Sequence, residues 1–230
     1  NYLGGDPNNP STTTNNVVRA TVENITGSVS ADQVEVRASY DGEIFNLALA
    51  GAAAGNFALG GSVSINRIRN TADAHVLSVG ILTATGGSSG PDVLVKAQDD
   101  SDIWVFAGGF GLAINLTQPA GAAFGVSVAH NTIRNAITAY VDASRVVAEG
   151  DLRVEAASPS TRIWAFSLAA AVAYSAASNT ALAGSVSGAF AINEIENTIN
   201  ASIRTTPAKV NVGDLALVRS NQGSVEVIAR

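Results

Sequence analysis

The sequence of 230 residues contains no cysteine, and this absence excludes disulfide bonds, thiol chemistry and cysteine-based zinc sites. It also contains no methionine, so it does not begin at a start codon, and we expect the chain to be cut from a longer protein. His75 and His130 are the only histidines, which leaves little material for a Ser-His-Asp triad or a histidine metal site. The sequence therefore predicts no enzyme and no catalytic residue.

Charge is scarce as well. Charged residues make up 14% of the sequence, against roughly 25% in an ordinary globular domain. The formal net charge is −6 and the pI is about 4.8, which argues against nucleic acid and against anionic membrane surfaces. We therefore expect neither nucleic-acid binding nor membrane insertion. Small and β-branched residues fill the gap, a composition typical of closely packed β-sheets.

The sequence repeats itself at intervals close to sixty residues. An alternating strand pattern begins at Val34, at Val93 and at Leu152, which are 59 residues apart (93 − 34 and 152 − 93), and a weaker fourth copy begins at Leu215. Two further anchors follow in the same order, an Ile-aromatic pair and an Asn-x-Ile-x-Asn motif: Ile44-Phe45, Ile103-Trp104 and Ile163-Trp164; Asn66–Asn70, Asn131–Asn135 and Asn193–Asn197. These anchors predict an irregular lead-in over 1–15 and one repetitive domain over 16–230, with units at about 16–65, 66–130 and 131–192 and a partial unit at 193–230.

Apolar residues after the Asn anchor alternate with a period of two, as in Ile133, Ile137 and Val141, which predicts strands with one covered face. Upstream, the alternation follows Val126 and changes parity at the anchor. This change predicts a bulge or a corner at the first Asn of the motif. Equivalent asparagines of stacked repeats are expected to form hydrogen-bonded ladders, one of Asn66, Asn131 and Asn193 and one of Asn70, Asn135 and Asn197.

Three stretches carry no formal charge, at 44–66, 103–133 and 163–193. Each is long enough to suggest a membrane-spanning helix, but Gly, Ser and Asn interrupt them and Leu and Ile are sparse. An Ala-rich helix over Phe166–Ala177 is a second alternative. We prefer buried strands, whose small side chains allow two sheets to approach closely.

Parallel stacking of such units predicts an all-β protein, a parallel β-helix or β-solenoid built from repeats of about 60 residues. One flattened coil per repeat, several short coils per repeat, and a stack of antiparallel hairpins remain open. In the hairpin alternative, the tips lie at 51–56, 117–121 and 175–180.

Asp99, Asp100 and Asp102 form the one tight acidic cluster, and clustered carboxylates are suitable ligands for calcium. The cluster is not part of the repeat, because Ser158 to Thr161 occupy the equivalent positions of the next unit. A solvated acidic turn is therefore the preferred interpretation, and no other cofactor is expected. With Asp142, the same carboxylates are the candidates if the protein is a polysaccharide-active enzyme.

Phe45, Trp104 and Trp164 form a repeated aromatic position. A row of aromatic rings is either part of the core or a sugar-binding strip on the surface. The preceding isoleucine and the following apolar run favour the core. Neighbouring side chains of a strand point to opposite faces, however, so either the isoleucine or the ring faces outward unless both faces are covered.

The segments 61–70, 126–135 and 146–156 resemble the β-strand repeats of very large bacterial surface and secreted proteins, among them filamentous-haemagglutinin-like adhesins and leukotoxin-type repeat proteins. The resemblance covers residues 16–230 and is mainly compositional. It implies an extracellular or bacterial cell-surface location, a structural or adhesive role, and self-association or contact with neighbouring repeats and surface glycans. A filament or surface-layer subunit is one form of that role; a carbohydrate-binding module and a polysaccharide-active β-helix enzyme are the alternatives.

Overall fold

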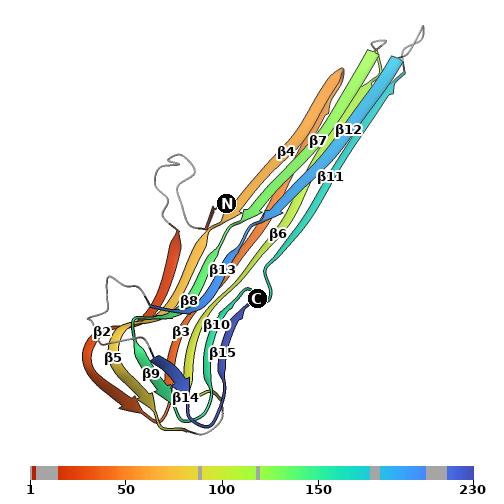
Figure 1. Ribbon diagram of the computed structural model, residues 1–230. Coiled ribbons are helices and arrows are strands. Elements are labelled where there is room, and N and C mark those ends of the chain that lie inside the picture. Colours follow the sequence, from red (N-terminus) through yellow and green to blue (C-terminus); the bar gives the residue numbers. More distant parts are fainter. Residues whose placement is uncertain (1, 4–14, 88–89, 118–119, 177–181, 206–216) are drawn as a thin grey trace.

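The computed structural model describes residues 2–3, 15–87, 90–117, 120–176, 182–205 and 217–230. These residues form an all-β structure of parallel sheets, one of them strongly curled, and no helix occurs among them. Figure 1 shows a long straight part, which we call the arm (the described residues within 44–66, 103–131 and 163–193), rising from a wider curled part, which we call the base (the other described residues from 16 onward).

The described strands lie in three sheets, and neighbouring strands within each sheet are parallel. The first forms one side of the arm: β1 (Tyr2–Leu3), β4 (Phe57–Ile68), β7 (Ala120–Ile133) and β12 (Leu182–Ile195). The second forms the other side of the arm and continues into the base: β3 (Val34–Ala54), β6 (Val93–Asn115), β10 (Leu152–Ala157), β11 (Arg162–Ser175) and β15 (Val225–Ala229). The third forms the curled side of the base: β2 (Asn16–Ala31), β5 (Asn70–Ala84), β8 (Ala136–Asp142), β9 (Arg145–Ala148), β13 (Thr198–Arg204) and β14 (Leu217–Ser220).

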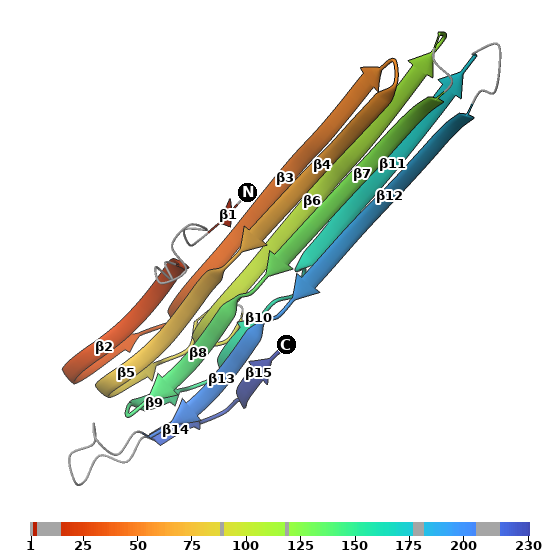
Figure 2. The same cartoon turned by 90° about the horizontal axis from the view of Figure 1, so that it is seen from above.

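Successive passes of the chain lie side by side in the order of the sequence (Figure 2). In the second sheet, Val34 pairs with Val93, and Val93 pairs with Leu152. Ile103 likewise pairs with both Ile44 and Ile163. The recurring sequence anchors are therefore neighbours in space.

The fourth copy of the strand pattern is in a different place from the one expected. Leu215 lies outside the described residues, and Leu217 belongs to β14, where it pairs with Arg145. The strand that pairs with Leu152 starts instead at Val225. Val225 lies further from Leu152 in the sequence than Leu215 does, because the last pass contains a longer segment between its equivalent strand starts.

The helical alternatives are wrong. Residues Arg162–Ser175 form the strand β11, because every second side chain packs inward against the opposite sheet. No helix among the described residues is long and apolar enough to cross a membrane.

The chain reverses direction between β3 and β4, at the first expected tip (Figure 1), but these two strands do not form a hairpin; the tips expected at 117–121 and 175–180 lie partly outside the described residues. β3 ends at Ala54 and β4 begins at Phe57, yet the two strands belong to different sheets. Each pairs with the next pass of the chain, and the two sheets of the arm face one another.

The interior changes character along the molecule. The base contains a cluster of fully buried valine, leucine and isoleucine side chains, such as Val95, Ile137 and Leu152. The innermost part of the arm is a small cluster of alanines, including Ala58, Ala113 and Ala123. Glycine replaces alanine where the sheets touch: a Cβ at Gly60 would overlap the Phe110 carbonyl oxygen. The small residues therefore face inward, as expected.

The expected bulge at the Asn anchor is absent. Every second residue from Gly121 to Val141 is buried, including Asn131, Ile133 and Ile137, although Thr132 is buried as well and the strand is interrupted between Ile133 and Ala136. Val126 belongs to the outward set. The parity of the apolar residues changes because large apolar side chains move from the outside of the arm to the inside of the base.

The curl of the third sheet coincides with a recurring left-handed residue. Asn24, Ser78 and Ala143 have φ values of 58°, 53° and 47°, and they occupy equivalent positions of successive passes. Side chains other than glycine adopt this conformation only at some energetic cost. The corner is therefore located about ten residues beyond the Asn anchor.

Candidate functional site

The asparagines of the repeated motif form two rows across the strands. In the first row, Asn66 donates from its amide to Asn131 at 2.8 Å, and Asn131 donates to Asn193 at 2.8 Å. In the second row, the main-chain N–H of Asn70 donates to the side-chain oxygen of Asn135 at 3.0 Å, and that of Asn135 donates to Asn197 at 3.1 Å. Both rows link neighbouring strands inside the protein, where an unpaired amide would be costly.

The second row leaves its amide groups free to cross the interior. Asn70 donates to Asp99 and to Ser101, both at 3.0 Å, and Asn135 donates to Asp99 at 2.6 Å. Ser101 donates to Asp99 at 2.6 Å. These four buried residues form a polar layer between the apolar core of the base and the isoleucine cluster above it.

The polar layer holds a buried carboxyl group. Burial raises the pKa of Asp99 above its ordinary 3.8, while hydrogen bonds from Ser101 and Asn70 act in the opposite direction. The sequence interpretation missed this role. Asp99 and Ser101 continue the inward alternation of Val93, Val95 and Ala97, and that parity was the signal available.

The acidic cluster does not converge on one point. Asp99 faces inward, whereas Asp100 and Asp102 lie on the outer face of β6 because they alternate with it. Asp102 forms an ion pair with Arg162 at 2.7 Å, and Asp100 accepts a hydrogen bond from the Ser160 main chain at 3.1 Å. A calcium site using all three carboxylates is therefore incompatible with this geometry, and no group of three or more His, Asp or Glu suited to a metal ion occurs among the described residues.

The other candidate carboxylate of the enzyme alternative lies far from the cluster along the chain and in another sheet. Asp142 forms an ion pair with Arg204 at 3.2 Å. Nearby, the ring of Tyr140 stacks on His75, with centroids 4.6 Å apart, and His75 contacts Asp73 at 2.9 Å. Asp142 lies at the end of β8, seven residues (142 − 135) beyond Asn135, which bonds to Asp99, so the two carboxylates are separated by roughly 23 Å along the strand direction.

The repeated aromatic residues lie outside, contrary to the preference for the core. Phe45 and Trp164 are 63% and 59% exposed and Trp104 is partly exposed, whereas Ile44 and Ile103 are buried and Ile163 is partly buried. The rings of Trp104 and Trp164 are stacked, with centroids 5.6 Å apart and planes 4° from parallel. Because one flat side of each indole ring is covered by the other ring, much of the stacking area that a sugar ring needs is already occupied.

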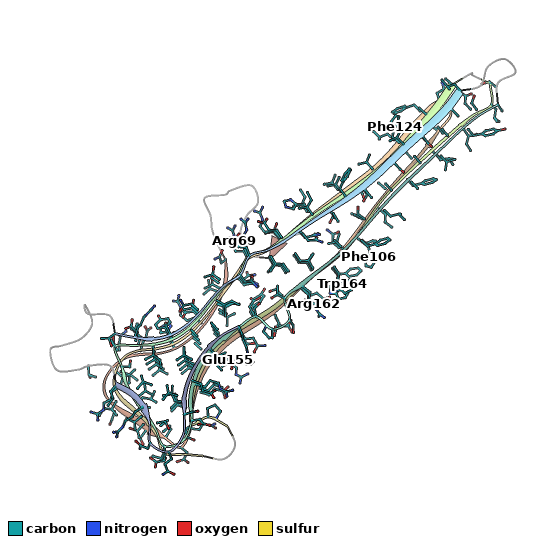
Figure 3. The ribbon with its side chains drawn as sticks, turned by 45° about the vertical axis from the view of Figure 1, so that its right-hand side comes forward. Arg69, Phe106, Phe124, Glu155, Arg162 and Trp164 are labelled. Atoms are coloured by element: carbon teal, nitrogen blue, oxygen red, sulfur yellow. The ribbon has the colours of Figure 1, made fainter. Side chains whose placement is uncertain are left out.

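The aromatic row is the lower border of a larger apolar surface. On the second sheet, Phe106 and Leu168 lie above the tryptophans, and on the first sheet Val126 and Phe190 lie on the opposite side of the arm. Figure 3 shows Phe106 and Trp164 on one outer side and Phe124 on the other. The exposed large apolar residues of the two faces are Phe45, Leu47, Leu49, Phe106, Phe110, Ile114, Trp164, Phe166, Leu168, Val172 and Tyr174, and Phe57, Leu59, Val63, Ile65, Val126, Leu182, Val186, Phe190 and Ile192.

Charged residues border this surface where the arm joins the base. On one face, Glu43, Asp102 and Arg162 are paired neighbours directly below the aromatic row. On the other face, Arg134 forms ion pairs with Glu194 at 2.9 Å and with Glu196 at 3.1 Å. Figure 3 shows Arg162 on one outer side at the foot of the arm and Arg69 on the other.

A shallow hollow of about 400 Å³ lies in the apolar face of the second sheet. It forms because Gly108 has no side chain between Leu49 and Leu168, and Phe110 borders it above. The lining offers no polar side chain, so it does not provide the directed hydrogen bonds by which sites recognise sugars or ions.

Comparison with protein-family models, with curated proteins and with solved structures finds no match to this chain.

Proposed function

We propose that this chain is a structural or adhesive segment of a β-solenoid on a bacterial surface or in the extracellular space, built from coils of about 60 residues. One observation carries the proposal: equivalent residues of successive passes are parallel, in-register neighbours in all three sheets. Repeats of this kind bury a core only by stacking on one another. The resemblance of the sequence to bacterial surface repeats supports the location.

The asparagine rows give the stack its register. A shift of one residue along a strand would place Asn131 on the outer face and would break its bonds to Asn66 and Asn193. Among the described residues, open sheet edges remain at β3 and at the part of β4 before its short pairing with β1 on one end, and at β11 and β12 on the other. Such edges are templates for a further coil of the same protein.

Joining two copies of the chain head to tail tests this proposal. If the coils stack, the particle should lengthen along the stacking direction by about 4.8 Å for each added coil, with the arm unchanged. Small-angle scattering and electron microscopy of the single and the joined chain measure both dimensions. Two separate particles on a flexible connection would contradict the proposal.

A further inference from the structure

The outer faces of the arm are apolar on two opposite sides. Leu168 is 58% exposed on one face, and Phe190 is 62% exposed on the other. The stretches 44–66, 103–129 and 163–193 contain no formal charge and no histidine. Monomeric proteins in water rarely expose contiguous apolar patches larger than a few hundred Å², so these faces indicate a partner that is itself apolar.

The dimensions of this surface are those of a lipid layer. Trp164 lies next to the ion pair of Arg162 with Asp102, and Tyr174 lies ten residues further along the same strand. Ten residues of a strand span about 33 Å, close to the roughly 30 Å of bilayer hydrocarbon. Tryptophan and tyrosine are enriched at the two borders of that layer.

The arrangement of the two faces distinguishes lipid from a second copy of the chain. A second copy packed on one face would leave the opposite face in water, whereas acyl chains surround both at once. Fluid acyl chains also fill the hollow at Gly108, which offers no polar partner to a sugar. The charged rows at the foot of both faces then lie at the level of the headgroups.

We propose that the arm is a lipid-contacting element whose two outer faces enter the acyl-chain region of a phospholipid bilayer up to the charged rows. Hydrocarbon offers no hydrogen-bond partner to a free strand edge. The proposal therefore rests on the proposed stacking in one respect: stacking pairs the edges at β3 and β4 of one copy with those at β11 and β12 of the next, so that only the two outermost edges of the joined chain stay unpaired.

The proposal replaces the expectation, drawn from composition, that the protein does not insert into membranes. That expectation rested on the net charge and on the scarcity of strong membrane-forming residues. The charges lie in the base and at the foot of the arm. In the arm above its isoleucine cluster, the large apolar residues face outward and small residues occupy the interior.

Trp104 and Trp164 are the only tryptophans of the chain, so they report directly on the foot of the arm. Joined chains, with their additional coils, are mixed with phosphatidylcholine vesicles, whose zwitterionic headgroups minimise net electrostatic attraction. We expect the protein to float with the vesicles and its tryptophan emission to shift to shorter wavelength. Lipids brominated near the headgroup end of the acyl chain should quench this emission more strongly than lipids brominated near its end.

Glutamate substitutions in the middle of the two apolar faces test whether these faces contact lipid. The double variant Leu168→Glu and Val186→Glu changes two exposed side chains, so we expect the folded structure in water to remain. Its partition into the vesicles should fall at least tenfold. Val17→Glu is the matched control, because Val17 is 56% exposed on the base and its replacement should leave partition unchanged.

Two results with vesicles would overturn the lipid proposal: joined chains that stay in the aqueous fraction, or a double variant that partitions like the unsubstituted chain. A third would be an oligomer, detected by sedimentation, that does not bind vesicles because the arms bury their apolar faces against a second copy. The dimensions of the joined chain are measured separately in water. Failure of lipid binding with correctly lengthened particles would therefore leave the proposed stacking intact.

Discussion

The base and the arm are built from the same strands but have opposite patterns. In the base, Val95, Ile137 and Leu152 face inward and charged residues such as Lys96 and Arg153 lie on the outside. In the arm above the isoleucine cluster at its foot, the interior consists mainly of alanine, glycine and serine, and the large apolar side chains face outward. The backbone alternation continues from one part to the other, so the difference lies wholly in which side chains occupy each parity. A continuous strand can therefore present opposite surfaces to its surroundings along its length.

The largest expected effect comes from removing a large side chain in each region. Leu152→Ala deletes a fully buried side chain of the base and should lower the free energy of unfolding by about 2–5 kcal/mol. Leu168→Ala makes the same change on the outer face of the arm and should cost less than about 0.5 kcal/mol. Urea unfolding of both variants measures the difference. An equal loss of unfolding free energy in both variants would mean that Leu168 is buried like Leu152, and hence that the large apolar side chains of the arm do not face outward.

Adjacent glycines provide a sharper test within the arm. Gly60→Ala places a methyl group against the Phe110 carbonyl of the facing sheet and should cost about 1–3 kcal/mol. Gly61→Ala points outward, where its nearest atom is the Val126 carbonyl oxygen at 3.4 Å, and should change stability by less than about 0.5 kcal/mol. Thermal unfolding of the pair checks the orientation. A reversed order would show that the two faces have been assigned wrongly.

The polar layer between the two regions should respond to pH. Because burial raises the folded-state pKa of Asp99, the folded state holds a proton more readily than the unfolded state does. The contribution of Asp99 to stability is therefore greatest below its unfolded value near 3.8, and it is lost as the pH rises through its higher folded value. Relative to Asp99→Asn, the unsubstituted protein should gain stability on acidification towards pH 4.

Asp151→Asn serves as the control for that measurement. Hydrogen bonds from the main chain and hydroxyl of Ser224 lower the pKa of Asp151 below 3.8, so its contribution is present above that value and is lost as the pH falls through the lower folded value. The two variants should therefore deviate from the unsubstituted protein in opposite directions. Parallel pH profiles of unfolding free energy would contradict the assignment for Asp99.

The smallest effect is expected at the aromatic row. Because Trp164 is 59% exposed and both tryptophans lie on the outer face, the double variant Trp104→Ala and Trp164→Ala should lose at most about 1.5 kcal/mol, mainly from the ring stacking. The same protein tested on a glycan array separates the surface alternatives. Lost sugar binding with an intact fold would favour a sugar strip over lipid contact.

The sequence was sufficient for the strand content and for the spacing of the anchors, because period-two alternation and recurring motifs are local signals. Ile44, Ile103 and Ile163 mark equivalent positions in the structure, as their spacing indicated. The same alternation led to a wrong bulge at Asn131, because a change of apolar parity was taken as a change of the backbone. Apolar periodicity reports which positions share a face, but it does not say whether that face is inside.

The remaining misses depend on contacts between distant passes of the chain. The corner at Asn24, Ser78 and Ala143 has three different side chains and therefore no sequence motif. The buried role of Asp99 depends on Asn70 and Asn135, which lie 29 and 36 residues away. Its place within the inward alternation was visible, but a carboxylate cluster suggested a solvated turn more strongly.

The asparagine rows also give the molecule a direction. The amide of Asn66 donates to Asn131 and that of Asn131 donates to Asn193, and the main-chain donors of the second row point the same way. The two ends of the molecule are consequently chemically unlike: at one end the oxygens of Asn66 and Asn70 accept from Asn46 and Asn16, and at the other end Asn193 and Asn197 are the last acceptors of their rows. If further coils are added at these edges, the two ends of the stack therefore grow by different contacts. A segment that covers one end does not fit the other.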